Sequence, residues 1–174
     1  LPDEYSRLYM AIENELAAVI CIEDPIREEA ADIIKKLKEA GIKKAVMMTG
    51  DSERTAKAVA AKIGVDEYYS EVLPEDKAEY VQKAKAEGHT VVMIGDGIND
   101  SPALSASDVG IAISDGAELA REIADVTVEG NDLYELVALK HISNALMKRI
   151  HKNYRMIMGI NSTLIVLGVA GIIP

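Results

Sequence analysis

The chain has 174 residues, a formal net charge of −10 at neutral pH, no Trp, no Phe and one cysteine. This length is enough to bury the core of one ordinary domain, and the first residue, Leu1 rather than Met, suggests a piece of a longer protein. The acidic balance excludes the basic stripes that bind nucleic-acid phosphates, and a single cysteine excludes a disulfide framework or a Cys-x-x-Cys metal site.

The first part of the chain alternates short apolar runs with segments of helical periodicity. Caps support the helices, since Asp24-Pro25 suits a helix start, while Gly41 and Gly64 suit helix ends. In chain order we expect strands at 8–12 and 15–22 around a turn at 13–14, helix 24–40, strand 45–48, helix 52–63, a short strand at 67–70 and helix 74–87.

The same alternation continues with strand 91–94, helix 102–106, strand 109–113, helix 117–124 and strand 125–128. Strands that alternate with helices at this pitch predict an α/β, Rossmann-like fold: a parallel sheet with helices on both faces. Ligands of such sheets bind beyond the carboxyl ends of the strands. Thr49, Asp96 and Asp100 all fall at such ends, which favours a single site.

The last part of the chain has a different pattern. Asn131-Asp132 is expected to cap a long helix, a basic cluster follows at 148–155, and 156–174 contains no charged residue. An apolar run of about 20 residues can span a bilayer, and basic residues favour its cytoplasmic end. We therefore predict a membrane helix at 156–174 with residues 1–150 cytoplasmic; the alternative is a buried C-terminal core helix.

The most informative segment is Gly-Asp-Gly-Ile-Asn-Asp-Ser-Pro-Ala-Leu, which begins at Gly95 and directly follows a predicted strand. Asp96 and Asp100 offer carboxylate oxygens of the kind that Mg²⁺ prefers. Gly95 and Gly97 permit backbone conformations that would let both carboxylates enter one crevice, and Asp100 or the next residue suits the cap of a helix that starts with Pro102. The alternative is a solvated turn rich in Asp and Asn.

This segment resembles the Mg²⁺-binding loop of P-type ATPases, which belong to the haloacid dehalogenase-like superfamily of phosphoryl-transfer enzymes. Three more matches occur in the same order: Met-Met-Thr-Gly-Asp ending at Asp51, Pro-Glu-Asp-Lys ending at Lys77, and Asp-Val-Gly-Ile-Ala-Ile beginning at Asp108. The wording of the loop and the short link from Val128 to the long helix resemble the heavy-metal-transporting branch.

The resemblance implies roles for the residues of the loop. Asp96 would be the direct Mg²⁺ ligand, and Asp100, also assigned to the metal site, would orient a metal-bound water or a neighbouring donor. Asn99 would offer its amide to a phosphoryl oxygen, and Gly97 would contribute to the same loop.

The earlier motifs imply a phosphoryl-binding group. Thr49, with the backbone of Gly50 and Asp51, would hold the phosphoryl group, although Asp51 has a competing duty as cap of the following helix. Lys77 would neutralise phosphoryl charge; the alternative is an ordinary surface lysine in the first turn of a helix, where the dipole disfavours a cation.

The family's phosphorylated aspartate lies in an Asp-Lys-Thr-Gly-Thr motif, which this sequence lacks, and no Asp-x-Asp pair replaces it. The resemblance therefore implies a tail of the nucleotide-binding region and hinge at 1–23, a phosphorylation domain without its first strand at 24–130, a linking helix at 131–155 and a transmembrane helix at 156–174. We expect this chain by itself to be inactive.

As part of an intact pump, the chain would act with ATP, Mg²⁺, a transported metal cation, the remaining domains of the pump and the lipid bilayer. Two alternatives remain: a soluble haloacid dehalogenase-like phosphatase, and a non-catalytic domain that binds Mg²⁺ or phosphate.

Overall fold

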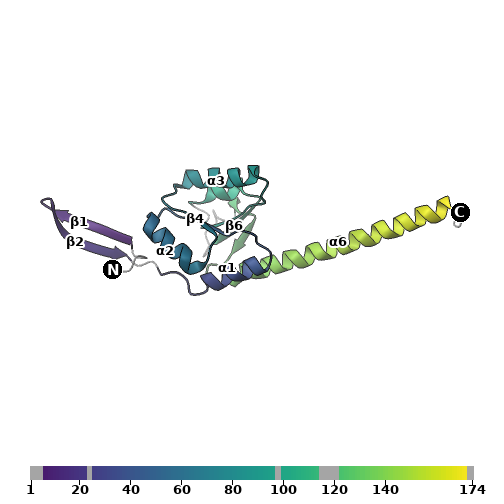
Figure 1. Ribbon diagram of the computed structural model, residues 1–174, viewed down its shortest axis with the longest axis horizontal. Helices are drawn as coiled ribbons and strands as arrows, with labels where there is room; N and C mark the ends of the chain where they lie inside the picture. Colours follow the sequence, from purple (N-terminus) through teal and green to yellow (C-terminus); the bar gives the residue numbers. More distant parts are fainter. Residues whose placement is uncertain (1–5, 23–24, 97–98, 114–121, 172–174) are drawn as a thin grey trace.

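The computed structural model describes residues 6–22, 25–96, 99–113 and 122–171. Figure 1 shows a central α/β body, with a strand hairpin projecting from one side and a long helix from the other. The elements are β1 (Ser6–Ile12), β2 (Glu15–Ile22), α1 (Ala30–Glu39), β3 (Val46–Met48), α2 (Glu53–Ile63), β4 (Glu67–Tyr69), α3 (Pro74–Ala86), β5 (Val92–Gly95), α4 (Ser101–Ala106), β6 (Val109–Ile113), β7 (Val126–Val128) and α6 (Tyr134–Val169).

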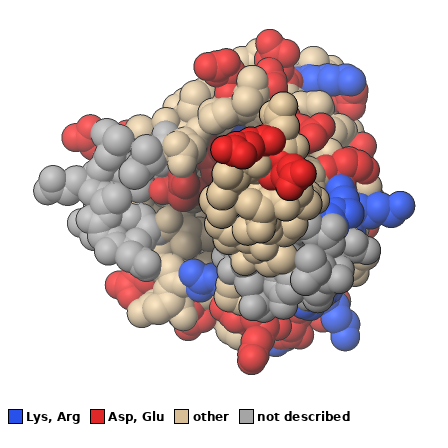
Figure 2. Space-filling view, turned by 90° about the vertical axis from the view of Figure 1, so that its left-hand side faces the viewer, with Lys and Arg blue, Asp and Glu red and all other residues tan. Residues whose placement is uncertain are grey.

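The N-terminal hairpin forms as the sequence predicts. β1 and β2 pair antiparallel, and Glu13 and Asn14 make the turn with φ angles of 50° and 66°. Apolar side chains of both strands are exposed, with Tyr9 61% and Leu16 63% accessible, and Cys21 is exposed as well. Figure 2 views the molecule from the hairpin side and shows that Asp and Glu predominate among the charged residues of this face.

Helix α1 begins later than the sequence suggests. The expected start at 24–25 is wrong, because the helix runs from Ala30 and residues 25–27 are not helical. The guanidinium of Arg27 donates a hydrogen bond to the carbonyl oxygen of Gly130, so the entering chain follows that long-range contact. The helix ends as predicted, with Gly41 at a φ of 105°.

The parallel strands form two separate ladders among the described residues, so the prediction of one continuous sheet is wrong in this respect. β3 pairs with β4, while β5, β6 and β7 pair in that order. Side chains join the two groups where hydrogen bonds do not, because Met48 of β3 packs against a buried cluster that includes Met93 of β5. The remaining members of that cluster come from α3 and α4: Val81, Ala103 and Leu104. The predicted helix 117–124 lies mostly outside the described residues.

Helix α6 is a single helix of 36 residues with no break at 155–156. Leu136 and Val137 are buried against the body, but the far half is exposed and extends away from it (Figure 1). Three contacts hold its base to α1: Tyr134 donates to Asp32 at 2.9 Å, Lys36 lies 4.7 Å from the centre of the Tyr134 ring, and Asn144 donates to the Ala40 carbonyl oxygen at 2.7 Å.

The membrane-helix part of the predicted fold is not confirmed. Within the stretches that the structure describes, no helix combines the length and the apolar character that a bilayer span requires. The polar and basic residues of α6, which continue up to Arg155, and the polar run 161–163 lower the hydropathy of the helix.

Candidate functional site

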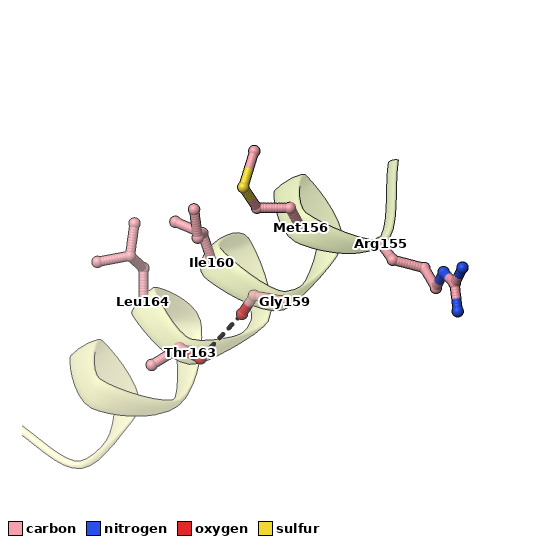
Figure 3. A pocket seen from close by; sticks show the side chains of 6 residues that line it. All are labelled: Arg155, Met156, Gly159, Ile160, Thr163 and Leu164. Carbon is pink, nitrogen blue, oxygen red and sulfur yellow. Dashed lines mark hydrogen bonds between the residues drawn. The ribbon is translucent and has the colours of Figure 1, made fainter. Parts of the chain in front are cut away.

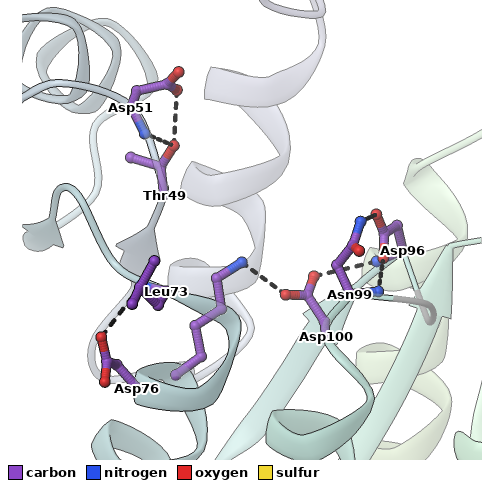
Figure 4. Close-up of polar contacts among 8 residues, drawn as sticks. Thr49, Asp51, Leu73, Asp76, Asp96, Asn99 and Asp100 are labelled. Atoms are coloured by element: carbon purple, nitrogen blue, oxygen red, sulfur yellow. Dashed lines mark hydrogen bonds and ion pairs between the residues drawn. The ribbon is translucent and has the colours of Figure 1, made fainter.

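The loop after β5 places three of the predicted residues together. Asp96 follows the strand directly, and its carboxylate accepts hydrogen bonds from the backbone N–H of Asn99 at 3.2 Å and from the Asn99 side-chain amide at 3.3 Å. The backbone N–H of Asp96 approaches Oδ2 of Asp100 at 3.4 Å. Figure 4 shows Asp96, Asn99 and Asp100 side by side and joined by these hydrogen bonds. Gly97 lies outside the described residues.

Lys77 and Asp100 form the central contact of the site. The Lys77 ammonium donates to Oδ1 of Asp100 at 2.7 Å, and the two side chains are only 15% and 12% accessible. A lysine in the first turn of a helix gains nothing from the helix dipole, so this buried partner accounts for its position. The Lys77 side chain therefore does not lie free on the surface, and its role in neutralising phosphoryl charge stays a prediction.

Asp100 occupies the cap position of α4 without capping it. Its side chain makes no hydrogen bond to the first turn of that helix, because the carboxylate is already bonded to Lys77. A close approach to Gly95 makes room for it: a Cβ atom on Gly95 would lie 2.4 Å from Oδ2 of Asp100. Gly95 is thus needed because any larger residue at this position would overlap the Asp100 carboxylate. The sequence pattern alone does not reveal this requirement.

The loop after β3 carries the second group. The hydroxyl of Thr49 donates to the Asp51 carboxylate at 2.7 Å, and the backbone N–H of Asp51 donates back to that hydroxyl at 3.1 Å. The expected capping duty of Asp51 falls instead to Ser52, whose side chain accepts from the backbone N–H of Thr55. Gly50 has space around it, since a Cβ atom there would have Val72 O at 3.8 Å as its nearest neighbour.

The two groups lie on two loops, and Figure 4 draws no hydrogen bond that joins the Thr49–Asp51 pair to the group of Asp96, Asn99 and Asp100. Figure 4 shows Thr49 with Asp51 on one side, and Asp96, Asn99 and Asp100 on the other. Both loops leave the carboxyl ends of strands, β3 and β5. The structure therefore brings Lys77 into the Asp100 group and leaves Thr49 and Asp51 as a separate pair.

The residues present fit a Mg²⁺ ion at Asp96 better than at Asp100. Mg²⁺ is usually held by one or two carboxylates together with water and phosphate oxygens, so the absence of a cluster of three metal ligands among the described residues does not oppose it. Asp96 is exposed, whereas Asp100 is 9% accessible and engaged by an ammonium.

Sequence reasoning missed Glu53 as a neighbour of the site. Its carboxylate accepts hydrogen bonds from Ser70 Oγ at 2.5 Å and from Tyr68 Oη at 2.7 Å, and these two bonds lower the pKa of Glu53. An acidic residue in the first turn of a helix is common on dipole grounds alone. No local signal therefore distinguishes this glutamate from a merely helix-stabilising one.

A shallow groove also lies along α6, far in the fold from the strand ends. Figure 3 shows its lining, with the hydroxyl of Thr163 donating to the carbonyl oxygen of Gly159 at 2.8 Å. The lining residues all belong to this helix: Arg155, Met156, Gly159, Ile160, Thr163 and Leu164. The groove contains none of the predicted site residues.

Residues 2–108 match the family of haloacid dehalogenase-like hydrolases. A zinc-exporting P-type ATPase of Mycobacterium marinum is 40% identical over 165 residues, which make up 94% of this chain and 22% of that protein. Copper-transporting ATPase 2 of Rhizobium meliloti is 43% identical over 169 residues, or 97% of this chain and 20% of that protein.

The crystal structure of a zinc-transporting PIB-type ATPase in the E2.Pi state superposes with a TM-score of 0.80 and 32% identity. The superposition covers 98% of this chain and 28% of that chain. This chain thus spans no more than 22% of the length of the two curated relatives. Its fold, its motifs and its similarity lead to one conclusion: the chain belongs to the haloacid dehalogenase-like hydrolase family and matches the part of it that occurs in heavy-metal P-type ATPases.

Proposed function

We propose that this chain supplies the Mg²⁺-binding and phosphoryl-binding groups of an ATP-driven heavy-metal cation pump. The observation that carries this proposal is the ion pair of Lys77 with Asp100 beside Asp96, at the carboxyl end of β5. A chain with these motifs and with P-type ATPase relatives over 94% of its length is best suited to aspartyl-phosphate chemistry.

The proposed chemistry relies on positioning and charge, as phosphoryl transfer generally does. Asp96 would hold the Mg²⁺, which when bound supplies positive charge to phosphoryl oxygens. Lys77 would present its ammonium to the same charge, with Asp100 keeping it in place. Thr49 would donate its hydroxyl to a phosphoryl oxygen after giving up its bond to Asp51.

The attacking carboxylate would come from a strand outside this chain. Among the described residues, β3 has only β4 as a hydrogen-bonded neighbour and β5 has only β6. Met48 of β3 and Met93 of β5 belong to one apolar core. We infer that a strand ending in Asp-Lys-Thr-Gly-Thr lies between them in the intact protein and completes one sheet.

The C-terminal part is proposed to enter the membrane. Residues 156–174 contain no charge and follow a basic cluster, and the exposed side chains of this part of α6 are largely apolar. We propose that they begin a membrane segment of the pump, with 1–150 in the cytoplasm. The relatives' names include both zinc and copper, so the proposal extends to the class of cargo, a heavy metal ion, and to no single element.

The test is formation of the phosphoenzyme from labelled ATP by the intact protein. Asp96→Asn removes the negative charge that would hold Mg²⁺ and should abolish labelling, while Glu79→Gln, an exposed control on α3, should label like the wild type. Undiminished labelling of Asp96→Asn would contradict the assignment. Release of phosphate from a phosphate monoester by this chain alone would favour the soluble phosphatase instead.

A further inference from the structure

The loop that carries Thr49 is held by the last two residues of β4 and by the segment that follows them. The backbone N–H of Thr49 donates to the Tyr69 carbonyl oxygen at 3.0 Å, and the N–H of Val72 donates to the Thr49 carbonyl oxygen at 3.0 Å. A third bond joins the N–H of Glu71 to the carbonyl oxygen of Asp51 at 2.9 Å. We call residues 68–73 the bracing segment, because their backbone groups bond to the Thr49 loop at both Thr49 and Asp51.

The bracing segment contains a strained residue. Glu71 has a φ of 54°, in the left-handed region that residues with a Cβ atom seldom adopt. Such a conformation persists only where surrounding contacts impose it. Contacts on both sides of Glu71 are therefore needed to keep the bracing segment in the shape that bonds to Asp51 and Thr49.

Glu53 provides those contacts on the side of β4. Its two carboxylate oxygens are used separately: Oε1 accepts from Tyr68 and Oε2 accepts from Ser70. Both partners belong to the bracing segment, whereas Glu53 is the first residue of α2 and comes just after the Thr49 loop. The Glu53 side chain thus connects the start of α2 to the end of β4.

The other end of the bracing segment leads directly to Lys77. Val72 is 6% accessible, and the backbone N–H of Leu73 donates to the Asp76 carboxylate at 3.3 Å as α3 begins (Figure 4). Lys77 lies in the first turn of that helix. The path from the Thr49 loop to Lys77 therefore runs through the bracing segment and is short and hydrogen-bonded.

We propose that Glu53 is a positioning residue, which sets the place of the Thr49 hydroxyl relative to the Lys77 ammonium by bridging Tyr68 and Ser70. The proposal rests on the function proposed above and extends it, since Glu53 itself would touch neither phosphate nor metal. The bridge needs two hydrogen-bonding atoms at the end of the side chain and does not need the negative charge.

The experiment measures phosphoenzyme formed by the intact protein from labelled inorganic phosphate and Mg²⁺, as a function of phosphate concentration. Glu53→Ala removes the bridge and should raise the half-saturating phosphate concentration about tenfold, the equivalent of about one hydrogen bond. Glu53→Gln should stay within about twofold of the wild type, because an amide can accept from one hydroxyl and donate to the other. Glu79→Ala is the matched control on an exposed surface.

Thermal melting separates positioning from stability. Glu53 is exposed, so the melting temperature of Glu53→Ala should stay within about 2 °C of the wild type. If Glu53→Gln is as weak as Glu53→Ala, or if affinity and melting temperature fall together, the bridge is not a positioning device. If Glu53→Ala binds phosphate normally while Asp96→Asn and Lys77→Ala do not label, the Glu53 proposal is refuted and the proposed function stands. Normal labelling of Asp96→Asn and Lys77→Ala would instead refute the proposed function itself.

Discussion

Gly95→Ala tests whether the Asp100 carboxylate depends on the missing side chain of Gly95. The added Cβ would lie 2.4 Å from Oδ2 of Asp100, 2.6 Å from its Cβ and 2.8 Å from its Cγ. Contacts between non-bonded carbon and oxygen atoms are favourable near 3.5 Å, so the carboxylate must retreat by about 1 Å. The 2.7 Å bond from Lys77 then lengthens beyond about 3.2 Å and weakens.

The cost follows from burial. Asp100 is 9% accessible, so its displacement strains a packed region, and overpacking of this kind costs about 1–3 kcal/mol. In a chain of this size, each kcal/mol lowers the melting temperature by about 2–4 °C. We therefore expect a decrease of about 2–12 °C in thermal unfolding followed by circular dichroism, and loss of phosphoenzyme in the intact protein.

Gly159→Ala is the matched control, because a Cβ atom there meets no atom within 4 Å and the residue lies inside a helix. Alanine is favoured over glycine in helices by about 1 kcal/mol, so this variant should melt no earlier than the wild type. If Gly95→Ala also melts like the wild type and still forms phosphoenzyme, the position of the Asp100 carboxylate does not depend on the missing side chain of Gly95, and the prediction is wrong.

Three further predictions follow from contacts in the body. Lys77→Ala should lower turnover of the intact protein at least tenfold with folding kept, since one lost charge-stabilising group often costs more than that; a wild-type rate would refute its role. Truncation after Ile150 keeps the Asn144 bond to α1, so circular dichroism should still show cooperative melting, and non-cooperative unfolding would identify the tail as core. Stability should decline in acid below about pH 4, because backbone hydrogen bonds first and lysines second lower the pKa values of Asp66 and Asp108 in the folded chain. This contribution to stability is complete above the unfolded pKa and is lost as the pH falls through the folded pKa. A melting temperature that does not change down to about pH 3 would contradict the prediction.

Local signals predicted the elements whose ends are determined locally. Gly41, Gly64 and Gly88 take positive φ angles where helices were expected to end, and the 13–14 turn joins the hairpin. The predicted start of α1 was wrong because Arg27 is hydrogen-bonded to Gly130, which is distant in sequence. A capping motif near position 24 reflects only neighbouring residues, so it cannot predict a contact with a residue so distant in sequence.

The continuous sheet could not be judged from periodicity, because hydrogen-bonded neighbours depend on which strands are present. Each strand pattern was correct by itself, and β3 and β5 do share a core through Met48 and Met93. Apolar patterning predicts which residues are buried, but it does not predict which strand edges meet. The same reasoning applies to α6. The lack of charge in 156–174 indicates an apolar segment, but it does not predict whether lipid or protein contacts that segment.

The motifs predicted that Lys77 and Asp100 belong to the site, but they did not predict that the two side chains form an ion pair. The two residues are 23 positions apart and lie on or beside α3 and α4, helices that pack through Val81 and Leu104. The ammonium reaches the carboxylate because this packing sets the distance between the helices. Gly95 then leaves the space that the carboxylate needs. The motifs predicted which side chains belong to the site, whereas the distance between those side chains is a property of the core beneath them.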